Sequence, residues 1–437
     1  MLSLKKYSIL KTLIFLLIST NLLFAQQKKG LKKEGLFSEQ VNGLIETTPL
    51  RTEINRVDGF FVAYQFPKDY LLQWNWAKKT FNLKPEHKFD IHFYVGYAFN
   101  AIEDTKKKKW RFSGEISKGF FETIPVYVGA RYYRMTDSKD NWRVGLSENS
   151  ASTAILSRDY RDYFKRIGQS LFLKFGFDAN TVFEVEYKFD KHRSLETTNT
   201  RISLFREDKL RYNPSLGPES VISNEILRPS DAAQAHGGKY NSLRLAYTWK
   251  TWERKNKIRL GYELNAEIEK TMGKESTNDF GFYLLEGKAY LPVTKKISYN
   301  TRVRLGSLTE TDLQQKRFEI GGISTLRGSD FKQYRGNRMF LWNNDLFFHS
   351  WTDSKTTEMI GWLGQLNFIL MLDIGQVWSE DESDNFYKAG GFSFSDLEAD
   401  VGVALTEKTG DLRLELNRTL SQKENQWAFY VRYSWDF

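Results

Sequence analysis

The last residues of the chain alternate between apolar and other side chains. From Trp427 to Phe437, every second position is aromatic or aliphatic, and the chain ends on Phe437. Side chains of a β-strand point to opposite faces with a period of two, so this segment predicts a strand with one apolar face. The opposite face carries Arg432, Ser434 and Asp436, which suits contact with water.

The same alternation recurs along the chain, most clearly at residues 89–99, 182–189, 258–268 and 412–417. The longer of these segments run for about 9–12 residues, the length that a tilted membrane strand needs, whereas strands of soluble sandwiches average roughly 5–6 residues. Acids on their second face would be costly in a packed core but cost little in a watery lumen. The pattern therefore predicts an all-β protein, a transmembrane antiparallel β-barrel.

About sixteen segments of this kind can be counted. An even number suits a closed bacterial barrel whose two chain ends both face the periplasm. The predicted strands start near residues 55, 88, 110, 124, 168, 181, 199, 239, 257, 280, 296, 338, 365, 396, 410 and 427.

The lengths of the connecting segments predict which side of the membrane each one faces, because periplasmic turns of such barrels are short and extracellular loops are long. One long stretch, residues 135–167, falls on the periplasmic side of this count. It is either a periplasmic excursion, with a helix around Asp159 to Phe164, or the sign of a strand miscounted upstream. The other connections fit, with 251–256, 292–296 and 407–410 short and periplasmic, and 207–237, 307–337 and 379–395 long and extracellular.

The N-terminus predicts export. Lysines 5, 6 and 11 precede an apolar core at 13–18, and Ala25 is a small residue in position for cleavage. This is the layout of a signal peptide spanning residues 1–25. A membrane anchor is the alternative, but polar residues at 19–21 interrupt a run already shorter than roughly 20 residues. The predicted organisation is a signal peptide at 1–25, a short periplasmic segment at 26–53 and the barrel at 54–437.

Composition removes several classes of protein. No apolar run of about 20 residues follows the signal peptide, so a helical membrane protein is excluded. The net charge of +10 falls to +7 without the three lysines of the signal peptide (10 − 3), and the charges are spread along the chain. This indicates a charged lumen and charged loops rather than a nucleic-acid surface. The chain has no cysteine, so disulfides and cysteine lipidation are excluded.

Candidate catalytic groups are sparse. The five histidines are scattered without metal-ligand spacing, and no Gly-x-Ser-x-Gly elbow occurs. An outer-membrane protease or phospholipase is the rival class, and His349 beside Ser350 is its candidate pair. Neighbours in a strand point to opposite faces, however, so these two side chains would diverge. We expect no enzyme, and no cofactor or metal.

One stretch carries a family resemblance. From Phe318 the chain reads FEIGGISTLRGSDFKQYRGNRMFLWNNDLFF. It resembles the sixth-loop motif of the BamA/TamA superfamily, also called the bacterial surface antigen family. Ser329 departs from that family, which usually has an aromatic residue there, and Phe331 is the candidate substitute. The matching residues are the pair Gly321 and Gly322, the core Leu326, Arg327 and Gly328, and the exit Gly336 and Asn337.

A second match follows at residues 372–378, LDIGQVW, where Asp373 and Gly375 resemble the family's Asp-x-Gly-x-hydrophobic-Trp strand. The resemblance implies that the long sixth extracellular loop folds into the lumen and that Arg327 pairs with Asp373. The alternation agrees, because Leu372 and Ile374 share one face and Asp373 points the other way. The alternative is that Arg327 and Asp373 are ordinary lumen charges.

The resemblance also implies partners and a location. Members of this superfamily are sixteen-stranded barrels of the bacterial outer membrane that handle other proteins. Tyr433, Trp435 and Phe437 resemble the signal by which such barrels are handed to the outer-membrane assembly machinery. The implied partners are outer-membrane lipid, client proteins and that machinery, and no nucleic acid.

The N-terminal part departs from the family, whose members usually carry periplasmic POTRA domains. Residues 26–53 are too few for one POTRA domain, so a flexible tether is expected, with a separate periplasmic protein as a candidate replacement. The implied function is insertion or translocation of proteins through a seam between the first strand, weakened by Gly59, and the last. A passive pore is one alternative, and a structural or adhesive barrel that binds through 207–237 is another.

Overall fold

The computed structural model describes residues 50–66, 89–101, 109–120, 125–178, 180–197, 202, 209–214, 216, 237–255, 258–309, 313–349, 366–380, 391–407, 412–420 and 427–433. The signal peptide expected at 1–25, most of the segment expected at 26–53, and the C-terminal Trp435 and Phe437 lie outside these described residues. None of the described helices is long and apolar enough to cross a membrane.

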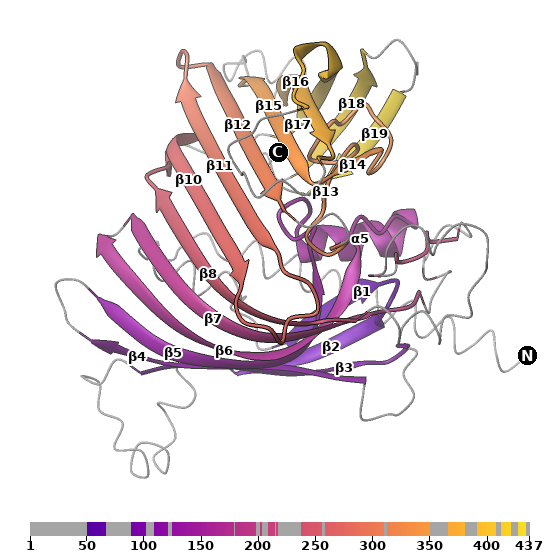
Figure 1. Ribbon diagram of the computed structural model, residues 1–437. Coiled ribbons are helices and arrows are strands. Elements are labelled where there is room, and N and C mark those ends of the chain that lie inside the picture. The colour runs from indigo at the N-terminus through magenta and orange to yellow at the C-terminus, as the bar shows by residue number, and fades with distance from the viewer. Residues whose placement is uncertain are drawn as a thin grey trace, which may run out of the picture.

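Within the described residues, sixteen strands, each antiparallel to the next, form the wall of the protein (Figure 1). Each pairs with its neighbour in chain order, and β8 pairs with β10 because the short β9 (Glu253–Lys255) lies at their turn. This is the predicted fold class, an all-β antiparallel barrel. The strands are β1 (Leu50–Asn55), β2 (Gly59–Phe66), β3 (Phe89–Ala98), β4 (Trp110–Phe120), β5 (Val126–Ser138), β6 (Tyr163–Asp178), β7 (Thr181–Ser194), β8 (Lys239–Lys250), β10 (Ile258–Thr271), β11 (Gly281–Pro292), β12 (Ile297–Leu308), β15 (Arg338–Phe348), β16 (Asn367–Trp378), β17 (Glu398–Thr406), β18 (Arg413–Thr419) and β19 (Trp427–Arg432).

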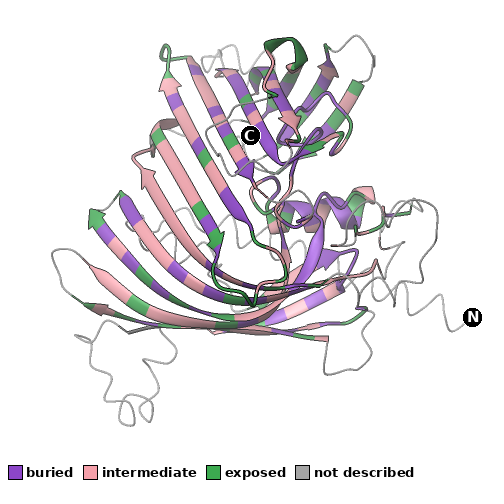
Figure 2. Ribbon diagram, in the orientation of Figure 1, coloured by how far each residue is buried: buried purple, intermediate pink, exposed green. Residues whose placement is uncertain are grey.

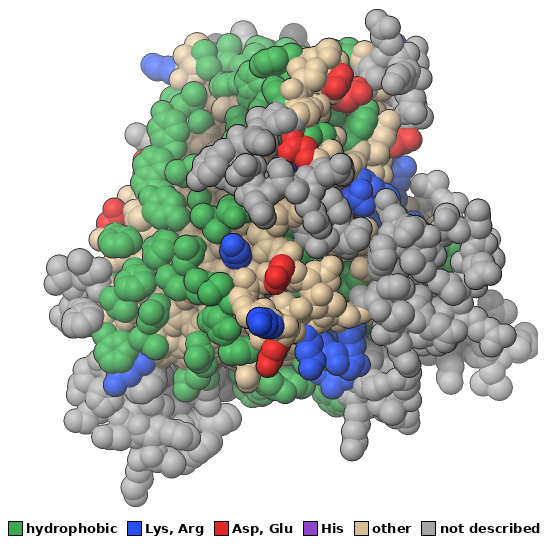
Figure 3. Space-filling view, viewed as in Figure 1, with side chains coloured by type: hydrophobic (Ala, Val, Ile, Leu, Met, Phe, Trp, Pro, Cys, Tyr) green, Lys and Arg blue, Asp and Glu red, His purple; other side chains and the backbone are tan. Residues whose placement is uncertain are grey.

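The predicted alternation produces two different faces of this wall (Figure 2). In β18, Leu414 and Leu416 are 42% and 41% exposed, whereas Glu415 and Asn417 are 0% and 1% exposed. The outward face is therefore apolar and the inward face is polar, as lipid on one side and a lumen on the other require. Figure 3 shows hydrophobic side chains gathered over the strands on the left of the view.

Two errors in the predicted strand list cancel in the total. The strand β1 lies in the segment expected to be mostly a tether, and the list omits it. The strand expected near residue 199 is wrong, because β7 pairs directly with β8; residues 198–201 lie outside the described part. Gly59 consequently begins β2, at the turn after β1 with a φ of 69°, and does not weaken the interior of the first strand.

These corrections place the stretch 135–167, which did not fit; within it, residues 139–162 connect β5 to β6. Strands β1 and β2 are joined at 56–58, and we call that end of the barrel the loop end. Residues 139–162 and 309–337 are the third and sixth connections at the loop end, and we call them loop three and loop six. Loop three is therefore not on the periplasmic parity, and the alternative of a strand miscounted upstream is the correct one. The connections after β8, β11 and β17 stay at the opposite end.

The helix expected around Asp159 to Phe164 is also misplaced. The helix of loop three is α5 (Leu146–Leu156), and Tyr163 and Phe164 begin β6. It lies between β1 and the C-terminal strands in Figure 1. Its buried residues are mostly polar, so no apolar stripe marked it in the sequence.

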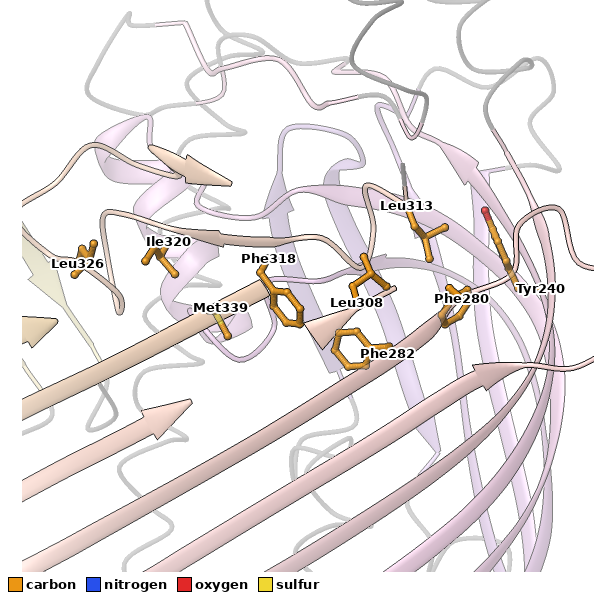
Figure 4. Close-up of a cluster of buried hydrophobic side chains, with 9 residues drawn as sticks. All are labelled: Tyr240, Phe280, Phe282, Leu308, Leu313, Phe318, Ile320, Leu326 and Met339. Carbon is orange, nitrogen blue, oxygen red and sulfur yellow. The ribbon is translucent and has the colours of Figure 1, made fainter. Parts of the chain in front are cut away.

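Loop six packs against the inner face of the wall through an apolar cluster (Figure 4). The ring of Phe318 in the loop stacks on Phe282 of β11, with 5.5 Å between centroids. Fully burying an apolar side chain of this size contributes roughly 1.5–3 kcal/mol. The cluster thus holds the start of the loop inside the barrel; its members are Tyr240, Phe280, Phe282, Leu308, Leu313, Phe318, Ile320, Leu326 and Met339.

Candidate functional site

Loop six forms a compact tip inside the lumen. The ribbon of β13 (Phe318–Ile320) and β14 (Tyr334–Gly336) brings its two arms together. Gly321 and Gly322 follow the first arm with φ values of 115° and 78°, a region that residues with a Cβ rarely adopt. A Cβ on Gly321 would lie 2.2 Å from the backbone oxygen of Asp330, so the turn requires glycine there.

The tip approaches the wall closely at Gly328. A Cβ added to Gly328 would lie 2.3 Å from the carbonyl carbon of Arg418 in β18. The loop backbone therefore lies against the strand backbone, which only a residue without a side chain permits. The fit at Gly375 of β16 is less strict, because a Cβ there would meet the Cδ1 atom of Ile320 at 3.0 Å.

This approach brings the side chain of Arg327 to two acids of the wall. Arg327 is fully buried, and its Nε and Nη2 donate to the two carboxylate oxygens of Asp373 at 2.7 and 2.6 Å. Its Nη2 also donates to Asp345 of β15 at 2.8 Å. The structure thus brings together Arg327 and Asp373, and it adds Asp345 to the pair. A planar guanidinium matches a carboxylate in this two-point manner.

A second layer of polar groups holds these acids. Asn343 Nδ2 donates to Asp373 at 2.7 Å, and Arg413 Nη2 donates to the free oxygen of Asp345 at 2.9 Å. Glu415 of β18 joins them through Arg413 Nε at 2.7 Å, so two arginines and three acids share one buried network. Buried charges persist when each one is paired and hydrogen-bonded, as here.

The tip has another anchor that the sequence did not reveal. Asp400 of β17 accepts hydrogen bonds from the backbone N–H groups of Gly328 and Ser329 at 2.7 and 2.9 Å, and the Ser329 hydroxyl also contacts it. Ser329, the position that departs from the family pattern, thus gains a polar role. The only available signal was the alternation of β17, which turns Val401 and Val403 outward and Asp400 inward.

Loop six also contacts loop three through a buried ion cluster. Lys332 Nζ lies 2.7 Å from Asp140, 2.5 Å from Asp162 and 2.8 Å from Glu319. Burial alone would lower the pKa of Lys332, but the three carboxylates outweigh burial and raise it. Burial would likewise raise the pKa of Glu319, whereas Lys139 and Lys332 lower it to about 2. The two loops therefore meet as charged partners.

The remaining motif residues lie where loop six leaves the tip. The side chain of Asn337 donates to the backbone oxygen of Glu380 at 2.9 Å and accepts from its N–H at 3.0 Å. Gly336 lies against β16, where a Cβ would approach the Trp378 oxygen to 2.2 Å. Leu326 is buried in the apolar cluster. Of the three residues expected to form the C-terminal assembly signal, Tyr433 is the one that the structure describes. Its backbone N–H donates to Glu148 of loop three at 3.2 Å.

The space beside the two loops is a charged cavity of roughly 1030 Å³. Its walls carry paired charges, such as Arg131 with Glu115 and Glu186, each at 2.6 Å. Within the described residues no group of three acids or histidines is placed to hold a metal ion. The site offers ion pairing and hydrogen bonding to a polypeptide or to water.

Comparison with known proteins gives one family match. Residues 236–395 match the family model of the haemolysin secretion/activation proteins ShlB/FhaC/HecB. This stretch includes loop six and the strand that carries Asp373. No curated protein matches the sequence significantly.

Solved structures match over most of the chain. BamA from Haemophilus ducreyi lacking POTRA domains 1–3 has a TM-score of 0.52 at 12% identity, covering 87% of this chain and 69% of its own. CdiB from Acinetobacter baumannii has a TM-score of 0.40 at 12% identity, covering 87% and 58%. CdiB from Escherichia coli has a TM-score of 0.39 at 13% identity, covering 90% and 68%.

The likeness to BamA is one of fold, since the identity is low. The family model adds that the central part of the chain, loop six included, resembles that of secretion proteins. The narrower BamA/TamA assignment of the motif goes beyond these matches. The chain is an outer-membrane β-barrel with the fold of BamA, and its residues 236–395 resemble the haemolysin secretion/activation proteins ShlB/FhaC/HecB.

Proposed function

We propose that this barrel inserts client proteins into the outer membrane or passes them across it, and that it does so by opening between its first and last strands, β1 and β19. The observation that carries the proposal is the fixed position of loop six in the lumen. Arg327 reaches Asp373 and Asp345 from a tip that also contacts β18 and β17. The tip of loop six is therefore attached to the inner face of strands β15 to β18, near the C-terminal end of the wall.

The energetics of this anchor favour a positional role. A buried ion pair adds little net stability compared with apolar residues of the same shape, but removing one partner costs about 3–5 kcal/mol. Arg327 therefore does more to fix where the loop lies than to stabilise the fold. A fixed loop beside the last strands is what a barrel needs if those strands must open and return to one arrangement.

The contents of the lumen count against the passive pore. Loop six and loop three meet inside the barrel through Lys332, and Arg143 of loop three donates to the backbone oxygens of Gly321 and Glu319 at 3.1 and 2.6 Å. A pore that serves small solutes needs a continuous water-filled path. Contact between the two loops narrows such a path.

The proposal is tested by the proteins that reach the outer membrane and cell surface of a deletion strain. We expect a defined set of proteins to be lost, and the wild-type chain to restore it. Arg327→Ala should fail to restore it, and Arg327→Lys should restore it only in part, because one ammonium group cannot contact both oxygens of Asp373 in a fixed fork. Quantitative proteomics measures all of these outcomes.

The matched control is Arg131→Ala, which removes a lumen arginine that pairs with acids of the wall and not with loop six. This variant should restore the missing proteins. A heat-dependent shift on a gel confirms that each variant has folded. If the deletion leaves the proteome unchanged, or if folded Arg327→Ala restores it fully, the proposal is wrong.

A further inference from the structure

The helix of loop three makes its buried contacts with polar side chains. The buried residues of α5 are Glu148, Asn149, Ser152, Thr153 and Ala154. A helix that packs on a hydrophobic core buries an apolar stripe instead. The position of α5 therefore depends on particular hydrogen bonds and ion pairs, and the partners in these contacts show which segments hold the helix.

One set of contacts binds loop three to the first strand. Ser150 Oγ accepts from the backbone N–H of Ile54 at 3.1 Å, and Ile54 packs with Ala154. At the end of β1, Arg56 donates through its backbone N–H to Asp159 at 2.9 Å and through Nη2 to Asp162 at 2.6 Å. Arg56 is fully buried, so these bonds are shielded from water.

A second set binds the same loop to the last strand. Glu148 Oε1 accepts from Arg432 Nε at 2.7 Å and from the backbone N–H of Tyr433 at 3.2 Å. Glu148 and Arg432 are 6% and 1% exposed. The rings of Tyr160 and Tyr430 also meet edge to face, 6.4 Å apart. One carboxylate oxygen thus carries two bonds to the end of β19.

Among the described residues β1 pairs with β2 and β19 pairs with β18, and no backbone pairing joins β1 to β19. We propose that loop three is the link that ties β1 to β19 across this seam, and that Glu148 is the residue that controls its release. This inference rests on the proposed function, in which that seam opens. When β19 moves away from β1, loop three must leave one of them. Leaving β19 separates the buried pair of Glu148 and Arg432, and leaving β1 separates Arg56 from two acids. Either step uncovers buried charges, and that cost opposes opening.

Loop six is coupled to the same device. Asp162 contacts Arg56 beside β1 and also contacts Lys332 of loop six. A displacement of loop six by a client chain would therefore remove a counter-charge from the acid that holds β1. Within the described part of loop six, Glu148 makes no bond to that loop, so its substitution tests the link between the two strands separately from the anchor of loop six.

The test is hydrogen exchange of the full-length protein in lipid nanodiscs. Glu148→Ala should speed amide exchange in β1 and β19 about tenfold or more, and it should leave β11 and β12 unchanged. Glu148→Gln keeps a hydrogen-bond acceptor without the charge, so it should give a smaller increase. The readout needs no client protein.

The matched control is Glu286→Ala in β11. Glu286 is also 6% exposed, and it pairs with one arginine, Arg304, at 2.6 Å. This variant should speed exchange in β11 and β12 only. If Glu148→Ala changes β1 and β19 no more than Glu286→Ala does, loop three does not hold the seam.

Delivery of client proteins separates this inference from the proposed function. If Glu148→Ala loosens β1 and β19 and also alters the amount of client proteins at the surface, both are supported. If it loosens the strands while the deletion strain shows no client loss, the seam device stands and the protein-handling function falls. If exchange is unchanged while deletion does cause client loss, the device is wrong and the function stands.

Discussion

At the scale of single residues, loop six depends on contacts that leave no room for a side chain. Gly328 lies so close to β18 that a Cβ would overlap the carbonyl carbon of Arg418. The same few atoms place Arg327 within reach of Asp373. Steric fit and charge pairing are therefore coupled, and a change in one should disturb the other.

Gly328→Ala should accordingly destabilise the barrel by about 1–3 kcal/mol, the usual cost of overpacking a tight site. The matched control is Gly287→Ala in β11, where an added Cβ would meet no atom within 4 Å. Thermal unfolding in detergent measures both variants. Equal unfolding temperatures for the two variants would show that the close approach of loop six is not needed.

The residues of this site differ in how far the sequence predicts them. Arg327 and Asp373 follow from the motif and from strand alternation, and the structure brings them together. Asp400 and Lys332 do not follow, because their partners lie 72 and up to 192 residues away. Alternation tells which face a side chain is on, and it does not tell which loop will meet it there.

At the scale of elements, loop six and loop three are held together by charge. Burial alone would raise the pKa of the Glu319 carboxyl, but the positive charges of Lys139 and Lys332 outweigh burial and lower it to about 2. A carboxyl whose folded pKa is depressed stabilises the fold above its unfolded pKa, near 4.5. That contribution disappears as the pH falls towards the folded value.

Glu319→Gln provides the comparison. The wild type should be more stable than this variant by the same amount at pH 7 and pH 5, and the difference should shrink as the pH falls from about 4.5 towards 2. Thermal unfolding in detergent across this range measures the difference. A difference that already shrinks above pH 5 would mean that Glu319 is not held by these lysines.

The elements also show where periodicity works and where it does not. Long strands such as β10 and β16 alternate clearly, and their positions were predicted closely. The strand β1 has only six residues, and its first four lie in a segment expected to be a tether. The helix α5 buries polar residues, so a search for apolar periodicity misses it. The total of sixteen strands is right because a missing strand offset a false one.

At the scale of the whole molecule, two loops from one end of the barrel meet inside it. This arrangement predicts low conductance for the purified protein in a planar bilayer, since Lys332 and Arg143 join the loops across the lumen. Removing the tip of loop six, residues 321–333, should raise the conductance several-fold. Steady high conductance of the wild-type protein would instead favour the passive pore.

The contact between Glu148 and Arg432 also bears on how the protein forms. These residues are 284 positions apart in the chain, so their pairing waits until nearly all of the polypeptide is available. Folds dominated by such distant contacts form slowly, because the entropy of closing long loops is lost before the contacts are gained. Loop three would spend that interval with Glu148 unsatisfied. Assembly of this barrel should therefore end in one late, cooperative step, in which its last strand finds a helix formed about a third of the way along the chain.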